Sequence, residues 1–392
     1  MKIVHAGFDG LDVAFRGVLP ERELEKLHGA KLEAQKERRR TFITLGQGVE
    51  MHVEETGAKG GFAFRCDTGA EGETWFFKRS AKEDWNIRVS VKSATLAILG
   101  YEGVKSRLYD VLERLGAKIC EVSIGRVDLA IDFLAPDFKL DPAHFVAHAK
   151  AGRSVYAQQE QQEDKQAGDW NIVWNGQRVL SVTVGKMPNR QVIVYDKSQE
   201  VKHRKKNYWW NIWGIEDKKS KVWRVEVRAG KKYLKERLGI STWQDLEQHM
   251  GDAFVDTLEK VRMRNPEIKT SNISRSGYHP MWRAALDRVQ DRFADTLQGK
   301  PSVRVIKEER NKMACIFRDL LCGTVTSYAE VRGVQQEELP SFVNDLATEI
   351  LHQMQSDKAK LRRKIKKAAD KYAFLKGAKY HYVPLRLWGK SE

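Results

Sequence analysis

Three segments of the chain carry ionisable side chains at every second residue, the spacing that puts them on one face of a β-strand. These residues are Arg126, Asp128 and Asp132 in GRVDLAIDF, Arg224, Glu226 and Arg228 in VWRVEVRAG, and Tyr195 and Lys197 in RQVIVYDKSQE. The residues between them are mostly Val, Leu and Ile, so each segment has one apolar face. If the three strands are neighbours in one sheet, their polar faces meet in a cluster of carboxylates, arginines, a lysine and a tyrosine.

Such a cluster has the parts for metal-assisted phosphoryl transfer to a tyrosine. A divalent metal ion, Mg²⁺ or Mn²⁺, would relieve the repulsion between carboxylates and polarise a phosphate oxygen. Arginines would bind the same phosphate in bidentate fashion while the phenol attacks in line. Because tyrosine has a pKa of about 10, it needs a nearby cation or base to react near neutrality. Spacing alone leaves a solvated sheet face open as the alternative.

The elements that must position these residues alternate between strand-like and helical patterns over the first two thirds of the chain. Residues 51–78 are punctuated by Gly and predict hairpins, and residues 141–150 predict a short helix after Asp-Pro. Further helices are predicted at residues 21–40, 103–116, 243–262, 281–297, 305–322, 339–355 and 356–376. The expected fold is α+β: an antiparallel-rich β-sheet catalytic domain with flanking helices over residues 1–268, then a helical, basic C-terminal region over residues 269–392.

Over roughly residues 8–238 the chain resembles the trans-acting Rep family, which contains plasmid and phage rolling-circle replication initiators and the relaxases of integrative conjugative elements. The residues that carry the resemblance are, in chain order, Arg126, Asp128, Ala130 and Asp132, then Gly185 and Lys186, then Tyr195, Asp196, Lys197 and Glu200, and lastly the run Arg224-Val225-Glu226-Val227-Arg228. The resemblance implies metal-assisted, strand-specific nicking of origin DNA. A tyrosine would become linked to a DNA 5′-phosphate, and the strand would later be rejoined.

The resemblance also implies a role for each matched residue. Asp128, Asp132 and Glu226 would be metal ligands, Arg126, Arg224 and Arg228 would contact phosphate, and Lys197 would assist them. Tyr195 would be the nucleophile, with Tyr156 as the second candidate. Many members carry another aromatic residue four positions before the motif tyrosine, where this chain has Gln191. The choice of nucleophile therefore stays open.

Charge indicates a polyanionic partner, because the chain has 69 Lys+Arg against 53 Asp+Glu and a net charge of +16. Two basic segments are candidate DNA contacts. Residues 202–214 combine Lys202, Arg204, Lys205 and Lys206 with Tyr208, Trp209 and Trp210, as expected of a grip on single-stranded or hairpin DNA. Residues 358–380 carry Arg362, Arg363 and Lys364 and would contact duplex DNA. The alternatives are a hydrophobic hairpin tip packed on the domain for the first segment, and a solvated or protein-pairing helix for the second.

Other features narrow the class of protein. The chain has no GxxxxGK[ST] loop, so no ATPase or helicase activity is expected within it, and a host helicase and single-strand-binding protein are expected partners. Its four cysteines form no CxxC pair, and Cys315 and Cys322 are expected in a helix core. A cytoplasmic location without membrane contact is expected, and a homodimer stays open. Two other functions remain: a non-catalytic DNA-binding regulator with a Rep-like fold, and an RNA-binding protein.

Overall fold

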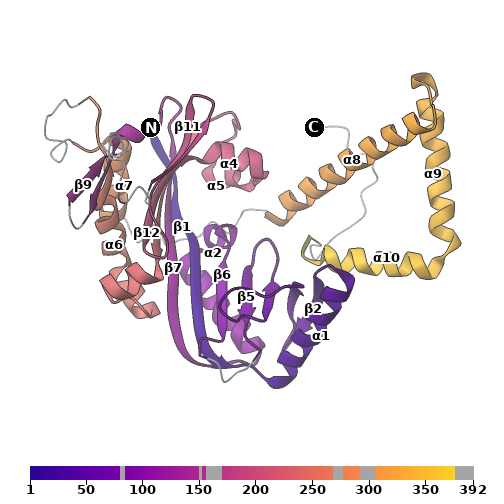
Figure 1. Ribbon diagram of the computed structural model, residues 1–392, viewed down its shortest axis with the longest axis horizontal. Coiled ribbons are helices and arrows are strands. Elements are labelled where there is room, and N and C mark those ends of the chain that lie inside the picture. Colours follow the sequence, from indigo (N-terminus) through magenta and orange to yellow (C-terminus); the bar gives the residue numbers. More distant parts are fainter. Residues whose placement is uncertain (80–83, 150–151, 156–169, 268–276, 292–304, 376–392) are drawn as a thin grey trace, which may run out of the picture.

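The structure is a computed structural model that describes residues 1–79, 84–149, 152–155, 170–267, 277–291 and 305–375. One antiparallel sheet of eleven strands crosses the molecule (Figure 1). In spatial order its strands are β10 (Trp170–Asn175), β11 (Arg178–Gly185), β12 (Arg190–Asp196), β13 (Val222–Gly230), β7 (Lys118–Leu134), β1 (Lys2–Val18), β6 (Ile87–Val91), β5 (Glu73–Phe77), β4 (Phe64–Asp67), β3 (Val49–Val53) and β2 (Thr41–Leu45). The predicted α+β class is confirmed.

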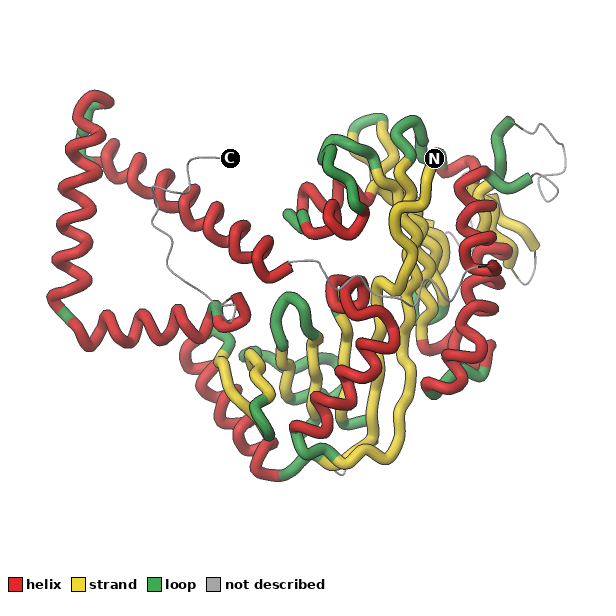
Figure 2. Tube along the Cα trace, turned by 180° about the vertical axis from the view of Figure 1, so that it is seen from behind, coloured by secondary structure: helices red, strands yellow, loops and turns green. Residues whose placement is uncertain are grey.

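The strands β1 and β7 pair along nearly their whole length and form the middle of the sheet. Their register shifts at four places, and such β-bulges bend a strand and increase its twist. Figure 2 shows these long strands running from the upper to the lower part of the molecule. Leu129 and Ile131 of β7 and Val225 of β13 lie in the main hydrophobic core, as the alternation of residue types predicts. The opposite face of the same strands is left for polar residues.

Helices α6 (Trp243–Lys260) and α7 (Pro280–Asp291) pack into this core. A capping box between Thr242 and Asp245 fixes the start of α6. Trp282 of α7 is fully buried, and its indole Nε1 donates to the Leu258 carbonyl at 2.8 Å. Near the other end of the sheet, α1 (Glu21–Glu37) and α2 (Ser93–Arg114) also bury their apolar sides in the core.

The helix predicted over residues 141–150 is wrong. A single 3-10 turn (Pro142–His144) is followed by β8 (Phe145–Ala149), which pairs with β14 (Val261–Met263) and β9 (Gly152–Val155) in a second, three-stranded sheet. Pairing with a strand more than a hundred residues away overrides the local pattern, which is the usual way in which context defeats propensity. The predicted domain boundary at residue 268 lies outside the described residues.

The C-terminal helices α8 (Val305–Val331), α9 (Leu339–Ser356) and α10 (Lys358–Lys371) form three sides of an open frame beside the sheet (Figure 1). The helical C-terminal region is therefore confirmed. Neither α9 nor α10 buries a residue. Phe374, which follows α10, contacts the sheet: its ring lies 5.8 Å from that of Phe42 and 5.0 Å from that of His52, measured between centroids.

The core position predicted for Cys315 and Cys322 is wrong, because both are exposed on α8. Large apolar side chains on this helix are exposed as well, including Leu320 and Leu321. An apolar pattern predicts a buried helix, whereas this helix touches little of the core. No described helix has the length and apolar character needed to cross a membrane.

Candidate active site

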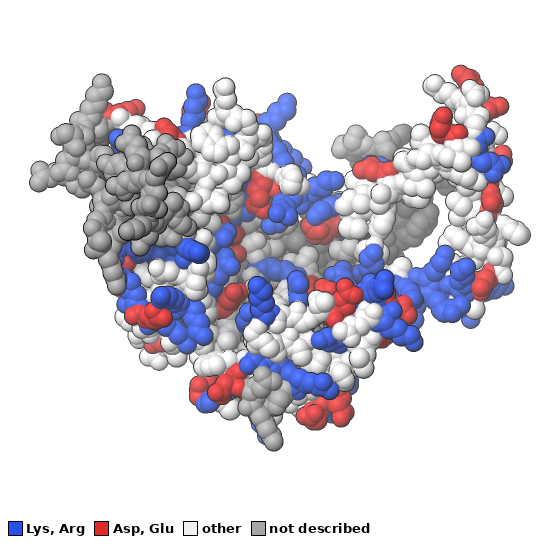
Figure 3. Space-filling view, viewed as in Figure 1, with Lys and Arg blue, Asp and Glu red and all other residues white. Residues whose placement is uncertain are grey.

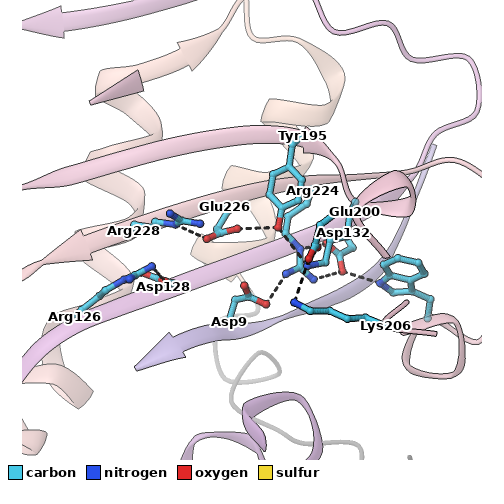
Figure 4. Close-up of polar contacts among 12 residues, drawn as sticks. Asp9, Arg126, Asp128, Asp132, Tyr195, Glu200, Lys206, Arg224, Glu226 and Arg228 are labelled. Atoms are coloured by element: carbon cyan, nitrogen blue, oxygen red, sulfur yellow. Dashed lines mark hydrogen bonds and ion pairs between the residues drawn. The ribbon is translucent and has the colours of Figure 1, made fainter. Parts of the chain in front are cut away.

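The strand register brings the predicted polar residues together on one face of the sheet. Arg224 of β13 lies opposite Asp132 of β7 on one side and Tyr195 of β12 on the other. Arg228 lies opposite Asp128, and Glu226 lies between the two arginines along β13. Figure 4 shows Tyr195, Glu226, Arg228, Arg224 and Asp132 pointing toward one another from neighbouring strands, and Asp128 pointing toward Arg126.

Arg224 is fully buried and bound by two carboxylates. Its Nε and Nη2 donate to the two oxygens of Asp132 at 2.6 and 2.7 Å, and its Nη1 donates to Asp9 at 2.5 Å. Burial acts to raise the pKa of Asp132, but the charge and hydrogen bonds of Arg224 outweigh it and hold that pKa below its usual value. The phosphate-contact role predicted for Arg224 does not fit this geometry, because the guanidinium already serves the two carboxylates and has no exposed surface.

Asp9 belongs to this cluster, although the sequence pattern did not single it out. The register of β1 against β7 shifts between Phe8 and Gly10, so Asp9 sits at a β-bulge. A bulge redirects a side chain that simple alternation would place elsewhere. Burial acts to raise the pKa of Asp9, but the Arg224 charge overcomes it and lowers that pKa well below its usual value. The one sequence signal was an acidic residue inside an otherwise strand-like run, FDGLDVAF.

Tyr195 is hydrogen-bonded to a carboxylate that an arginine holds from its other side. The Tyr195 hydroxyl donates to Glu226 Oε2 at 3.0 Å, and Arg228 Nε donates to Glu226 Oε1 at 2.6 Å. The side chain of Tyr195 is half-buried on the polar face of the sheet. Burial, and then the negative charge of Glu226, raise the pKa of Tyr195 well above its usual value. The resting state is therefore a neutral phenol with a proton acceptor in contact.

Lys197 approaches the same hydroxyl from the start of helix α4 (Lys197–Arg204). Its Nζ lies 3.4 Å from the Tyr195 oxygen and 2.5 Å from a carboxylate oxygen of Glu200. Asp196 caps the helix, accepting from the Gln199 backbone N–H at 2.9 Å. Burial, and next the charge of Arg224, lower the pKa of Lys197. The Tyr-Asp-Lys run thus places a phenol, a helix cap and a buried cation in succession.

Arg126 and Asp128 form a second ion pair farther along β7. Arg126 donates to both oxygens of Asp128, from Nε at 2.8 Å and from Nη2 at 2.5 Å. Gly10 of β1 makes room for this carboxylate, since a Cβ there would lie 2.5 Å from Asp128 Oδ2. Burial raises the pKa of Asp128 to about 7, although Arg126 opposes the shift. The side chains of Arg126 and Arg228 are 33% and 31% exposed, so these two arginines can meet a ligand.

The structure does not bring the three predicted metal ligands together. Asp128 and Asp132 are four residues apart on one strand, or about 13 Å at ~3.3 Å per residue. Asp128, Asp132 and Glu226 each bind a different arginine. Within the described ranges no group of three or more His, Cys, Asp or Glu residues could hold a metal ion. The donor set therefore does not fit one shared ion, and dependence on Mg²⁺ or Mn²⁺ stays a prediction.

The aromatic residues of the first basic segment are buried. Tyr208, Trp209 and Trp210 lie in helix α5 (Tyr208–Trp213), exposed by 5%, 0% and 2%. They pack with α2 in a second apolar cluster, and the Trp209 ring lies 4.4 Å from the Arg224 guanidinium. Their predicted stacking on DNA is therefore wrong. They pack over the buried part of the site instead. The alternative was a hydrophobic hairpin tip packed on the domain: the packing is confirmed, but the segment is a pair of short helices and not a hairpin.

The cations of that segment differ in availability. Lys202, Arg204 and Lys205 are exposed, whereas Lys206 pairs with Glu200 at 3.1 Å. Trp213 of helix α5 also contacts the site, because its Nε1 donates to Asp132 Oδ2 at 2.7 Å. In the second basic segment, the three predicted contacts are all exposed on α10: Arg362, Arg363 and Lys364. Figure 3 shows Lys and Arg side chains gathered on this helix. Tyr156, the second candidate nucleophile, lies outside the described residues.

No known protein-family profile matches the sequence, and no curated protein is similar to it. Among solved structures, a rolling circle replication initiator protein from Geobacillus stearothermophilus is similar, with 18% sequence identity and a TM-score of 0.37. The match covers 73% of this chain and 96% of that chain. The identity and the TM-score are both too low to carry the chemistry of that protein over to this one.

Proposed function

We propose that this protein nicks and rejoins DNA, with Tyr195 as the nucleophile, in the manner of a rolling-circle replication initiator or relaxase. One observation supports this above all: a neutral tyrosine whose hydroxyl donates to the Glu226 carboxylate at 3.0 Å. Tyr233 has a similar arrangement in the hydrophobic core, where its hydroxyl donates to Asp256 and Asp256 binds Arg190. Tyr195 differs because its side chain is partly exposed beside the partly exposed Arg228, and a phenol that reacts there needs a proton acceptor in contact.

The bond changes follow from this geometry. The Tyr195 oxygen attacks a backbone phosphorus, its bond to phosphorus forms, and the bond from phosphorus to the 3′-oxygen breaks. The phenol proton passes to Glu226, because the raised pKa of Tyr195 disfavours a free phenolate before attack. The 3′-oxygen takes up a proton from solvent, and Glu226 later releases one. The product is a 5′-phosphotyrosyl link and a free 3′-hydroxyl, and the reverse reaction rejoins the strand.

Two cations have defined parts in this step. Arg228 binds Glu226 through Nε, and its partly exposed side chain leaves the outer guanidinium nitrogens to reach a phosphate oxygen. The Lys197 ammonium lies 3.4 Å from the phenol oxygen and favours negative charge there as the proton leaves. Arg126 is the second exposed arginine on this face and would contact a neighbouring phosphate. Any divalent ion would need ligands other than the three predicted carboxylates, and no step above depends on it.

The substrate is DNA in this proposal, with the single strand at the sheet face and duplex at the cations of α10. A host helicase, a single-strand-binding protein and a second copy of the chain are proposed partners of the same process. A non-catalytic DNA-binding regulator is the second candidate function. It is favoured by the fact that every carboxylate described at the site is matched to an arginine or a lysine, as in a stable polar network.

A covalent-adduct assay separates these two functions. The full chain is incubated with a pool of randomised single-stranded oligonucleotides that carry a 3′ fluorophore, with Mg²⁺, with Mn²⁺ and with EDTA. A nick by Tyr195 leaves the fluorophore on the protein in a denaturing gel, and Tyr195→Phe abolishes the labelled band. Tyr328→Phe on α8 is the matched control and keeps the band.

Each result of the assay has a definite meaning. Labelling that survives in Tyr195→Phe excludes Tyr195 as the nucleophile and transfers the role to another tyrosine such as Tyr156. Absence of labelling in all three conditions, with oligonucleotide binding intact, supports the regulator. Labelling of an RNA pool in place of DNA overturns the proposed substrate.

A further inference from the structure

A pocket of about 390 Å³ opens at the far end of the face that carries Tyr195. It lies among β1, β6, β7 and the residues that follow β13. The lining residues that matter here are Asp12, Phe62, Trp85, Arg88, Ser123 and Lys231. None of them takes part in the site described above.

The strand register shows that the pocket and the tyrosine share one face of the sheet. Asp12 lies opposite Arg126, the residue that binds Asp128, and the next residue of β1 on that face, Ala14, lies opposite Arg88. Along β7, Gly125 at the pocket is seven residues from Asp132, which corresponds to about 23 Å at ~3.3 Å per residue. Arg126 and Arg228 lie between the two ends. A strand of DNA lying on this face with its phosphate at Tyr195 would therefore reach the pocket.

The floor of the pocket is aromatic and cationic. Phe62 lines the pocket and packs at 6.0 Å on Phe76, which does not line it, and both rings are almost buried. The Arg88 guanidinium lies 5.2 and 4.2 Å from their ring centroids. Its buried Nε has no hydrogen-bond partner among the described residues. Trp85 and Arg88 also line the pocket and are partly exposed, and planar groups of this kind are the surfaces on which unstacked bases bind.

The polar groups determine which part of a nucleotide fits inside. Two carboxylates line the pocket, those of Asp12 and Asp84, and they would repel a phosphate. A carboxylate accepts from the N–H groups of a base, with the exocyclic amino group of cytosine as the standard partner. Lys78 and Lys231 also line the pocket and suit the phosphates that flank the base. The volume is that of a small-ligand pocket.

We propose that this pocket binds one base, flipped out of the DNA strand that lies at Tyr195, and selects a base with an exocyclic amino group over thymine. The inference rests on the proposed function for the identity of the strand. It adds a specificity site several nucleotides from the cleaved phosphate. Trp85 and Arg88 stack on the base, and Asp12 accepts from its amino group.

The test measures binding without cleavage, using the full chain with Tyr195→Phe. Fluorescence anisotropy compares labelled (dT)20 with the same 20-mer carrying a single central dC. The dC oligonucleotide binds roughly 5- to 150-fold more tightly, the range for one good base contact. Adding Asp12→Ala abolishes this preference, and Asp110→Ala, an exposed aspartate on α2, is the matched control that keeps it.

A second variant tests the stacking surface. Trp85 has a φ of 49°, which Asn tolerates better than most residues, so Trp85→Asn removes the ring without straining the turn. It weakens binding of both oligonucleotides by roughly 5- to 150-fold. Equal affinity for the two oligonucleotides, or a preference that persists in Asp12→Ala, overturns the proposal.

The outcomes also separate this proposal from the proposed function. Covalent labelling through Tyr195 without any base preference contradicts base binding in the pocket and supports the nicking activity. A base preference that depends on Asp12, in a protein that never labels, keeps the pocket as part of a single-strand-binding protein and rejects the enzyme. A preference for rC over rU in the matching RNA 20-mers, without one in DNA, overturns the DNA-strand assignment.

Discussion

Two segments of this protein are alike in composition and opposite in structure. Residues 202–214 and residues 358–375 are both rich in Lys and Arg and both carry aromatic residues. In the first segment Trp209 and Trp210 are buried against α2 and the sheet, whereas α10 in the second buries no residue. A segment with several closely spaced aromatic residues is packed against the protein here, whereas a helix with many charges and no aromatic residue is exposed.

The charges of the two regions differ in the same way. Beneath the first segment, buried and partly buried charges are matched: Arg224 binds Asp9 and Asp132, and Glu200 binds Lys197 and Lys206. Helix α10 has eight Lys and Arg against one Asp, and its contacts with the sheet domain lie near its C-terminal end: the Lys367–Glu37 ion pair, hydrogen bonds from His52 and Arg40 to the Asp370 and Lys371 carbonyls, and the neighbouring Phe374. Removing a charge from the first region should therefore cost stability, and removing one from the second should cost affinity for a polyanion.

The largest effect is expected for Arg224→Ala, because it leaves two buried carboxylates without their cation. Breaking a buried ion pair on one side costs about 3–5 kcal/mol. Urea unfolding measures this, with Arg363→Ala on α10 as the exposed control, expected within about 0.5 kcal/mol of wild type. Adding Asp9→Asn and Asp132→Asn to Arg224→Met should recover much of the loss, since the uncompensated charges are then gone. A loss below about 1 kcal/mol would erase the contrast between the regions.

An intermediate effect is expected at Asp128, and it depends on pH. Its pKa is raised from 3.8 to about 7, so the native state keeps a proton that the unfolded state has lost. The contribution of Asp128 to stability is thus fully present below about pH 4 and is lost as pH rises to about 7, at about 1.4 kcal/mol per pH unit. Asp128→Asn does not lose this contribution, so its free energy of unfolding rises relative to that of wild type between about pH 4 and about pH 7. If the stability of Asp128→Asn relative to wild type instead increases toward low pH, the Arg126 ion pair outweighs burial and lowers the pKa of Asp128.

Period-two alternation was sufficient to predict the polar face of β7 and β13 and the direction of Tyr195 in β12, because the pleat fixes where each side chain points. It was wrong to extend the β12 face to Lys197, which is the first residue of helix α4. The same geometry also argues against the predicted metal site. Asp128 and Asp132, four residues apart on a strand, are too distant to share one ion. The tryptophans at 209, 210 and 213 also have helical spacing, which favours a buried helix over a hairpin tip.

Other features could not be predicted from the sequence. The position of Asp9 depends on a bulge, and bulges leave no dependable local pattern. The pocket requires that β1 pair with β6 and β7, a consequence of long-range order in an eleven-stranded sheet. Helix α8 is exposed because little of the molecule lies beside it. Its apolar composition predicts a buried helix, so the sequence does not reveal this exposure.

The smallest effect on stability is expected for the triple change Arg362→Gln, Arg363→Gln and Lys364→Gln, which should alter the free energy of unfolding by less than about 0.5 kcal/mol. Its effect is expected in binding: the salt dependence of affinity for a 20-base-pair duplex should weaken by ~3 in log–log slope, near 0.9 for each phosphate that the variant no longer neutralises. Anisotropy titrations over a series of salt concentrations give this slope. The control replaces three exposed lysines of the turn before β13, Lys218, Lys219 and Lys221, and keeps the slope. If the triple change lowers stability and leaves the slope unaltered, α10 is a packed element after all. The two basic segments would then differ in degree and not in kind.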